Sequence, residues 1–141
     1  LFPFCSPHLT SKKWPYYNDL ISLINEKLEN KFKVVIAPGP GEIKEAASIN
    51  ALCILDNGKA LDISQLAALI KDSSFVVAND TGPAHMTAHL GSKGIALFGA
   101  HTTDHKVSID RENFKAIQVS DLIKLSAQKV FEKLILSLDT H

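Results

Sequence analysis

The segment Phe75–His85 combines residue types and spacing that suit the binding of a phosphate. An apolar strand runs into a turn at Gly82, and Pro83 is well placed at the first position of a following helix. The free N–H groups at a helix start, and the positive end of the helix dipole, favour a pyrophosphate. Asp80 and His85 would face the same ligand. The alternative is that Asp80 only caps the helix and His85 only packs against it.

A second polar segment, Ser6–Pro15, follows the apolar residues Leu1–Cys5. Its hydroxyls and the adjacent Lys12 and Lys13 stand just before a predicted helix, where they would bind phosphate by hydrogen bonding and by point charge. The alternative is a solvated loop in which Trp14 fills the junction between helix and sheet. The tryptophan fits this structural role, and the role of the two lysines stays open.

The turn Pro38–Glu42 begins like a dinucleotide-binding fingerprint. Lys44 stands where the third glycine is required, so the pattern G-x-G-x-x-G fails, and the chain has no Walker A sequence. What remains is a tight turn that delivers Glu42 to the start of a helix. From spacing alone, interaction of this carboxylate with the helix dipole is favoured. The alternative is that it binds the paired hydroxyls of a ribose, as acidic residues do in nucleotide folds.

Two other chemistries fit the sequence poorly. Asp80–Gly82 spells the Asp-Thr-Gly of aspartic proteases, where two such aspartates share a proton. One copy followed by a helix, in a chain that is not all-β, excludes that reading. His85 and His89 have the spacing of zinc ligands on a helix, and His101 and His105 repeat it. No acid or cysteine completes either set, so the sequence predicts no metal site.

Alternating strands and helices must position these segments. Apolar, strand-like runs are Leu1–Cys5, Phe32–Ala37, Ala51–Leu55, Phe75–Ala78, Gly94–Phe98 and Phe114–Val119. The expected helices are Tyr16–Glu29, Glu42–Ile49, a helix capped by Asp62, Pro83–Leu90 and a last helix capped by Ser120. Strands this apolar are covered on both faces, which predicts an α/β fold with a doubly wound, mostly parallel, Rossmann-like sheet. Such sheets bind ligands beyond the carboxyl ends of their strands.

The composition bounds the class of protein. The 141 residues are 45% hydrophobic and 21% charged, as in one ordinary globular domain, and the net charge of +0 excludes a general attraction for nucleic acid or anionic membrane. No apolar run approaches the roughly 18 residues of a membrane helix. Cys5 and Cys53 are expected to be reduced thiols of a cytosolic protein. Because the chain opens inside the apolar run Leu1–Cys5, without the flanks of a signal peptide, it is expected to be a piece of a longer protein.

In order along the chain, the motifs resemble the C-terminal half of glycosyltransferase family 9, the ADP-heptose:lipopolysaccharide heptosyltransferases of Gram-negative bacteria. Lys12–Pro15 looks like the family's Lys-x-Trp-Pro, and Pro38–Glu42 is similar to its second-strand loop ending in Glu. The stretch from Val77–His85 to Ala96–Gly99 looks like its signature, which runs from Asn-Asp-[Ser/Thr]-Gly-x-x-His to Leu-Phe-Gly. The similarity covers nearly the whole chain, and the last motif is long and specific.

The resemblance implies an enzyme of the GT-B type, with two Rossmann-like domains and the active site in the cleft between them. Residues 1–141 would be the single domain that binds the nucleotide sugar, and the N-terminal acceptor domain would be absent from this chain. That domain supplies the catalytic aspartate in the family. The chain alone is therefore expected to bind the donor and to catalyse nothing.

Residue roles also follow from the resemblance. It implies that Lys12 contacts the donor phosphate, Glu42 the ribose, and the backbone of Thr81 and Gly82 the pyrophosphate. Asp80 and His85 would lie beside phosphate and sugar.

The sequence departs from the family pattern in two loops. Pro7 and His8 replace the family's Ser or Thr, so Ser6, Thr10 and Ser11 are the expected substitutes for those hydroxyls. The loosely similar loop from Ala100 to His105 is expected to shape sugar specificity.

The implied reaction is metal-independent and inverting, and it uses no cofactor. Heptose would pass from ADP-heptose to the inner core of lipopolysaccharide, in the cytoplasm, with at most peripheral contact with the inner membrane and none with nucleic acid. Two alternatives stay open: a nucleotide-binding module without catalysis, and a related glycosyltransferase that uses another nucleotide sugar.

Overall fold

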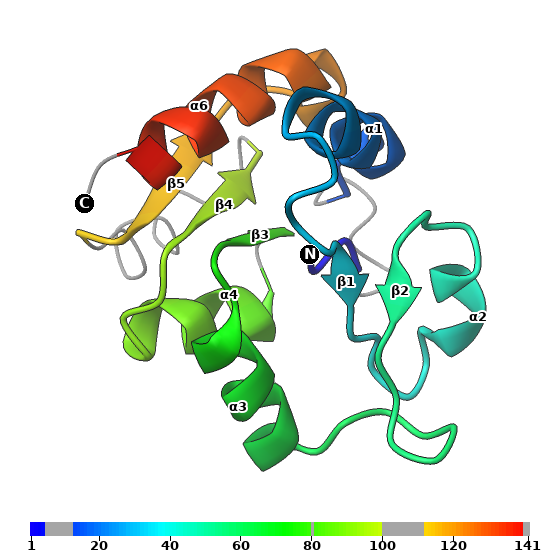
Figure 1. Ribbon diagram of the computed structural model, residues 1–141. Coiled ribbons are helices and arrows are strands. Elements are labelled where there is room, and N and C mark those ends of the chain that lie inside the picture. Colours follow the sequence, from blue (N-terminus) through cyan, green and yellow to red (C-terminus); the bar gives the residue numbers. More distant parts are fainter. Residues whose placement is uncertain (5–12, 80, 100–111, 140–141) are drawn as a thin grey trace.

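The computed structural model describes residues 1–4, 13–79, 81–99 and 112–139, and helices and strands alternate along them (Figure 1). The helices are α1 (Tyr17–Lys27), α2 (Ile43–Ala46), α3 (Ile63–Asp72), α4 (Gly82–His89), the 3-10 helix η2 (Leu122–Lys124) and α6 (Ala127–Asp139). The strands are β1 (Val35–Ile36), β2 (Leu52–Cys53), β3 (Val76–Asn79), β4 (Gly94–Phe98) and β5 (Phe114–Gln118).

The strands are parallel, and the first residues of the chain join them into one order. β1 pairs with β2, while β3, β4 and β5 are neighbours in that sequence. Leu1–Phe4 lies between the two groups: Phe2 forms a parallel bridge with Ala78, and the Leu1 amino group donates to the Val35 carbonyl at 2.8 Å. With Leu1–Phe4 as strand 1, the order across the sheet is 3-2-1-4-5-6, that of the dinucleotide-binding folds.

Alternate residues of the strands pack into two separate helical layers. Val77 and Ile95 belong to a cluster with apolar residues of α1 and α6. Their neighbours Ala78 and Ala96 point the other way, into a cluster with residues of α3 and α4. Figure 1 shows the same arrangement, with α1 and α6 on one side of β3 and β4 and with α3 and α4 on the other. The expected doubly wound α/β fold is confirmed.

One predicted helix start is confirmed by the structure, and another is wrong. Asp62 caps α3 as expected, in a capping box with Gln65. The prediction of one last helix capped by Ser120 is wrong. Asp121 caps the short η2, its carboxylate accepting the Ile123 N–H at 3.1 Å, and α6 begins only after Ser126, whose hydroxyl accepts the Lys129 N–H at 3.2 Å.

A long-range contact explains the interruption between η2 and α6. The Trp14 indole N–H donates to the Leu125 carbonyl at 2.7 Å, so that carbonyl is taken by a residue 111 positions earlier in the chain. The expected helix Glu42–Ile49 is also shorter than predicted. α2 ends at Ala46, and the Asn18 side chain binds the backbone of Ser48 and Asn50 just beyond it.

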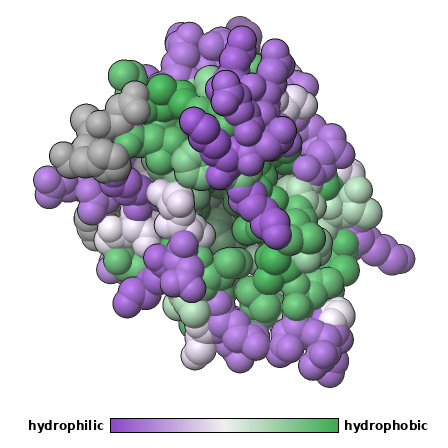
Figure 2. Space-filling model, viewed as in Figure 1, coloured by the Kyte–Doolittle hydropathy of each residue, from purple (hydrophilic) through white to green (hydrophobic). Residues whose placement is uncertain are grey.

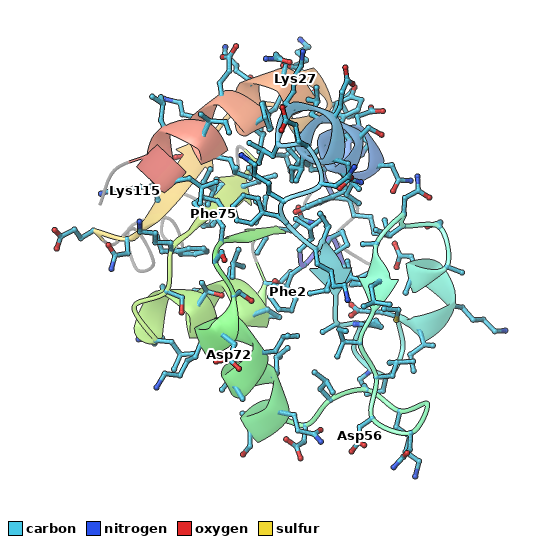
Figure 3. All side chains as sticks on the ribbon, viewed as in Figure 1. Phe2, Lys27, Asp56, Asp72, Phe75 and Lys115 are labelled. Atoms are coloured by element: carbon cyan, nitrogen blue, oxygen red, sulfur yellow. The ribbon has the colours of Figure 1, made fainter. Side chains whose placement is uncertain are left out.

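A groove of about 380 Å³ lies at the amino ends of β1 and β3. Leu1, Val34, Phe75, Ile70 and Leu134 are among the residues that line it. Figure 2 shows apolar side chains around a hollow on this face, and Figure 3 labels Phe2 and Phe75, which both line the groove. The Leu1 amino group is buried here, and burial lowers its pKa from 8.0 to about 5.

In the chain of residues 1–141 the buried amino group predicts a pH dependence of stability, and a longer form, in which the Leu1 nitrogen is an amide, has no such group to titrate. Between about pH 5 and pH 8 the unfolded amino group is protonated and the folded one is not, so the free energy of unfolding should fall as the pH is lowered through this range. The loss has an upper limit of about 4 kcal/mol. The measurement is urea unfolding of the free chain and of an N-acetylated chain, whose amide can still donate to Val35 but does not titrate.

The difference in free energy of unfolding between these two chains isolates the amino group, because all other titrating groups are common to both. A difference that stays constant from about pH 5 to about pH 8 would contradict the assignment.

Gly94 predicts a second stability effect, because β4 begins where no side chain fits. A Cβ atom at Gly94 would stand 2.3 Å from the Val76 carbonyl oxygen and 2.7 Å from the Phe114 ring. Gly94→Ala should therefore lower the free energy of unfolding by at least about 2 kcal/mol in urea unfolding. Gly41→Ala is the matched control, since a Cβ there meets nothing within 4 Å. It should change the value by no more than about 0.5 kcal/mol, and equal losses in the two variants would refute the close-approach argument.

Candidate functional site

The carboxyl ends of parallel strands gather the polar segments at one edge of the sheet. Pro38–Glu42 follows β1, Thr81 and Gly82 follow β3, and Leu1–Phe4 ends between these two strands. Neighbouring strands are about 4.8 Å apart, so the ends of β1 and β3 are separated by roughly 10 Å. This is the point where the strand order reverses, at which open α/β sheets bind their ligands. The apolar groove lies at the opposite edge.

Glu42 stabilises the turn after β1 by hydrogen bonding with Gly39, at the beginning of that turn. One carboxylate oxygen, Oε1, accepts the N–H of Gly39 at 2.8 Å, and the Gly39 carbonyl accepts the N–H of Glu42 at 3.0 Å. Glu42 stands at the start of α2 but makes no side-chain cap there. Its second oxygen, Oε2, has no hydrogen bond to any residue that the structure describes. The half-buried carboxylate is thus oriented by its turn, with one oxygen left to accept hydroxyl donors.

The start of α4 presents backbone N–H groups at the same edge. Thr81 is the N-cap residue in an extended conformation, and its carbonyl accepts the N–H groups of Ala84 and His85 at 3.1 and 3.3 Å. Within residues 1–4, 13–79, 81–99 and 112–139, the N–H groups of Thr81 and Gly82 have no acceptor. A Cβ at Gly82 would meet nothing within 4 Å, so the space in front of this helix start is open. Two free donors at the positive end of a helix suit an anion.

The structure describes His85 and His89 but not Asp80. His85 is half-buried in the first turn of α4, and His89, one turn further, is exposed. Asp80 lies outside the described residues, so its predicted role stays a prediction. Among the residues with described positions there is no group of three His, Cys, Asp or Glu side chains that would hold a metal ion. Cys53 is a free, half-buried thiol.

In the first segment, the structure describes one of the two lysines. Lys13 donates from its ammonium to the Glu45 carboxylate of α2, which ties the end of this segment to the second one. Lys12, the predicted phosphate ligand, lies outside the described residues, as do Ser6, Thr10 and Ser11. Trp14 is 2% exposed and packs edge-on against Tyr17 at 5.0 Å, so the expected structural role of Trp14 is confirmed.

Sequence reasoning did not find the polar contacts that link the segments. Besides the pair Lys13–Glu45, the hydroxyl of Tyr17 donates to the Asn79 side chain at 3.0 Å, and the Asn79 amide donates to the Pro3 carbonyl at 2.9 Å. The one signal for such a contact was a polar residue, Asn79, at the end of an otherwise apolar strand. Its partners are 62 and 76 positions away, so no local pattern identifies them.

Comparison with known proteins gives the same fold. The sequence matches the model of glycosyltransferase family 9 (heptosyltransferase) over residues 1–135. Among solved structures, the chain is similar to the E. coli heptosyltransferase WaaC with ADP, with a TM-score of 0.79 and 21% sequence identity over 96% of this chain and 42% of that one. WaaC with ADP-2-deoxy-2-fluoro heptose gives a TM-score of 0.75 and 20% identity over 96% and 41% of the two chains.

A third structure, that of E. coli ADP-heptose lps heptosyltransferase II, gives a TM-score of 0.73 and 22% identity over 96% and 44% of the two chains. The chain thus spans less than half the length of these proteins. No curated protein matches the sequence significantly. No helix within the described ranges is long and apolar enough to cross a membrane. The family model covers all the segments discussed above, and the chain belongs to glycosyltransferase family 9, the heptosyltransferases.

Proposed function

We propose that this chain is the donor-binding domain of an inverting heptosyltransferase, which transfers heptose from ADP-heptose to the inner core of lipopolysaccharide. The observation that carries the proposal is the meeting of an oriented carboxylate, Glu42, and a free helix start, Thr81–Gly82, at one sheet edge in a family 9 chain. Residues 1–141 form this single domain. The acceptor and the catalytic base belong to a second domain, and the reaction takes place in the cytoplasm, at most peripherally at the inner membrane.

The dimensions of the edge fit a nucleoside diphosphate. Glu42 binds the ribose through its Oε2, since a carboxylate oxygen accepts hydrogen bonds from hydroxyls. The pyrophosphate lies roughly 10 Å away, at the end of β3, on the N–H groups of Thr81 and Gly82. Lys12 adds a positive charge from the segment between them. Asp80 and His85 lie beside the phosphate and the sugar.

Electrostatics supports a local rather than a global attraction for this ligand. The chain has no net charge, so an anion must be held by specific groups. A helix start and a lysine stabilise the negative charge that develops on the diphosphate as it leaves, the role that a divalent cation has in other transferases. Titrating acceptor into a longer, two-domain form of the protein loaded with ADP-heptose tests the transfer step. Donor binding without transfer to any core acceptor would count against it.

The donor site predicts a pattern of ADP affinities. ADP should bind the chain saturably in calorimetric titration, and Lys12→Ala and Glu42→Ala should each weaken the affinity by about tenfold, because each removes a charged hydrogen-bonding partner. A chelator should leave the affinity unchanged. Lys27→Ala (Lys27 is labelled in Figure 3) and Glu26→Ala are matched controls in the exposed last turn of α1, and they should bind like the parent chain.

Two results would contradict the proposal. Absence of binding at millimolar ADP by a folded chain would rule out a donor site formed by this domain alone. Unchanged affinity in Lys12→Ala and Glu42→Ala would move the site away from these two segments.

A further inference from the structure

We propose that Asn79 and Tyr17 form a positioning pair for the donor site, in which the buried Asn79 side chain holds the end of β3 so that the N–H groups of Thr81 and Gly82 point at the diphosphate. The proposal rests on the donor-binding function above. Neither residue touches the ligand in this arrangement, and both act through the backbone that follows β3.

The burial of Asn79 is the first argument. Its relative exposure is 0%, and the other residues of β3 are apolar. A buried amide costs free energy unless all its polar atoms have partners. Here the carbonyl oxygen Oδ1 accepts the Tyr17 hydroxyl at 3.0 Å, and Nδ2 donates to the Pro3 carbonyl at 2.9 Å. The amide therefore connects three separate elements: β3, α1 and the strand at the start of the chain.

The backbone of Asn79 makes the second link, toward the site. Its N–H donates to the Phe2 carbonyl at 3.2 Å, and its own carbonyl accepts the Thr81 hydroxyl at 3.3 Å. The residue that caps α4 is thus bonded to the residue that the pair fixes. Thr81 does not use its hydroxyl to cap the helix, so this bond orients the turn without occupying the free N–H groups.

The contacts explain what a polar side chain contributes at this position. An apolar residue would fill the volume at no cost in desolvation, but it would leave the Pro3 carbonyl without this donor and the end of β3 without a sideways restraint. A small displacement of a binding group is enough to weaken its interaction strongly. The pair is therefore expected to affect the affinity for the ligand as well as the stability of the chain.

The hydroxyl of Tyr17 provides a conservative test, and Tyr16 provides its matched control. Both rings pack edge-on against Trp14, at 5.0 and 5.9 Å, and both hydroxyls donate one hydrogen bond. The Tyr16 hydroxyl, however, donates to the Ile123 carbonyl at 2.6 Å, away from β3. Calorimetric titration of ADP into the parent chain, Tyr17→Phe and Tyr16→Phe should show about fivefold weaker binding for Tyr17→Phe alone.

Asn79→Asp adds a readout that a merely structural role would not change. A protonated carboxyl can accept from Tyr17 and donate to Pro3, as the amide does, whereas the carboxylate cannot donate. Burial raises the pKa of such a carboxyl. The ADP affinity of Asn79→Asp, relative to the parent chain at the same pH, should therefore be close to one at about pH 6 and fall by about tenfold at about pH 8.5.

The outcomes separate the two proposals. A folded parent chain that does not bind ADP overturns the proposed function and with it this inference. If the parent chain binds ADP, equal affinities of Tyr17→Phe and the parent chain overturn the positioning pair alone, as do equal losses in Tyr16→Phe and Tyr17→Phe. A pH-independent affinity ratio for Asn79→Asp likewise overturns it.

Discussion

The hydrogen bonds of Phe2 with β3 are the interaction on which the rest of the fold depends. The Phe2 N–H donates to the Val77 carbonyl at 2.9 Å, and the Phe2 carbonyl accepts the Asn79 N–H. Together with the bond from Leu1 to Val35, they join the pair β1–β2 to the group β3–β4–β5. Without this short first strand the molecule would consist of two separate sheets. Because the strand runs parallel to both neighbours, its carboxyl end lies at the same edge as those of β1 and β3, and the reversal in strand order falls at this edge.

Features of this fold that depend on neighbouring residues could be predicted from the sequence, whereas features that depend on contacts between distant residues could not. Hydrophobic periodicity indicated the strands β3 and β4 and the helices α1 and α3, and the Asp62 cap was recognisable because its partner Gln65 is three residues away. The interruption before α6 was not recognisable, since it depends on Trp14, far away in the sequence. The candidate site shows the same division. Turn and helix-start patterns predicted Glu42, Thr81 and Gly82 as site residues. The hydrogen bonds that connect the site to distant segments could not be predicted from local sequence.

The candidate site also shows how a chain without net charge can offer a local binding site for an anion. Among the described residues, its positive potential comes from the start of α4, and not from an excess of basic residues. Lys13 is paired with Glu45, so it holds two segments together in the folded chain. Acidic side chains have two structural roles at the edge of the sheet where the strands end. Glu45 fixes a neighbour, and Glu42 folds its own turn while exposing an oxygen. Charge at this edge is therefore arranged for geometry as much as for attraction.

The position of Trp14 has a practical consequence. It is the only tryptophan of the chain, it is almost fully buried, and it directly follows the segment that contains Lys12 and Lys13. Its indole bonds to Leu125, and two tyrosine rings lie within 6 Å of it. Intrinsic fluorescence thus comes from a single reporter at the junction of α1, the sheet and α6, and both tyrosines are close enough to transfer excitation energy to it. The emission wavelength will follow solvent entry at this junction, so one unlabelled optical signal can monitor the packing that supports the first segment of the site.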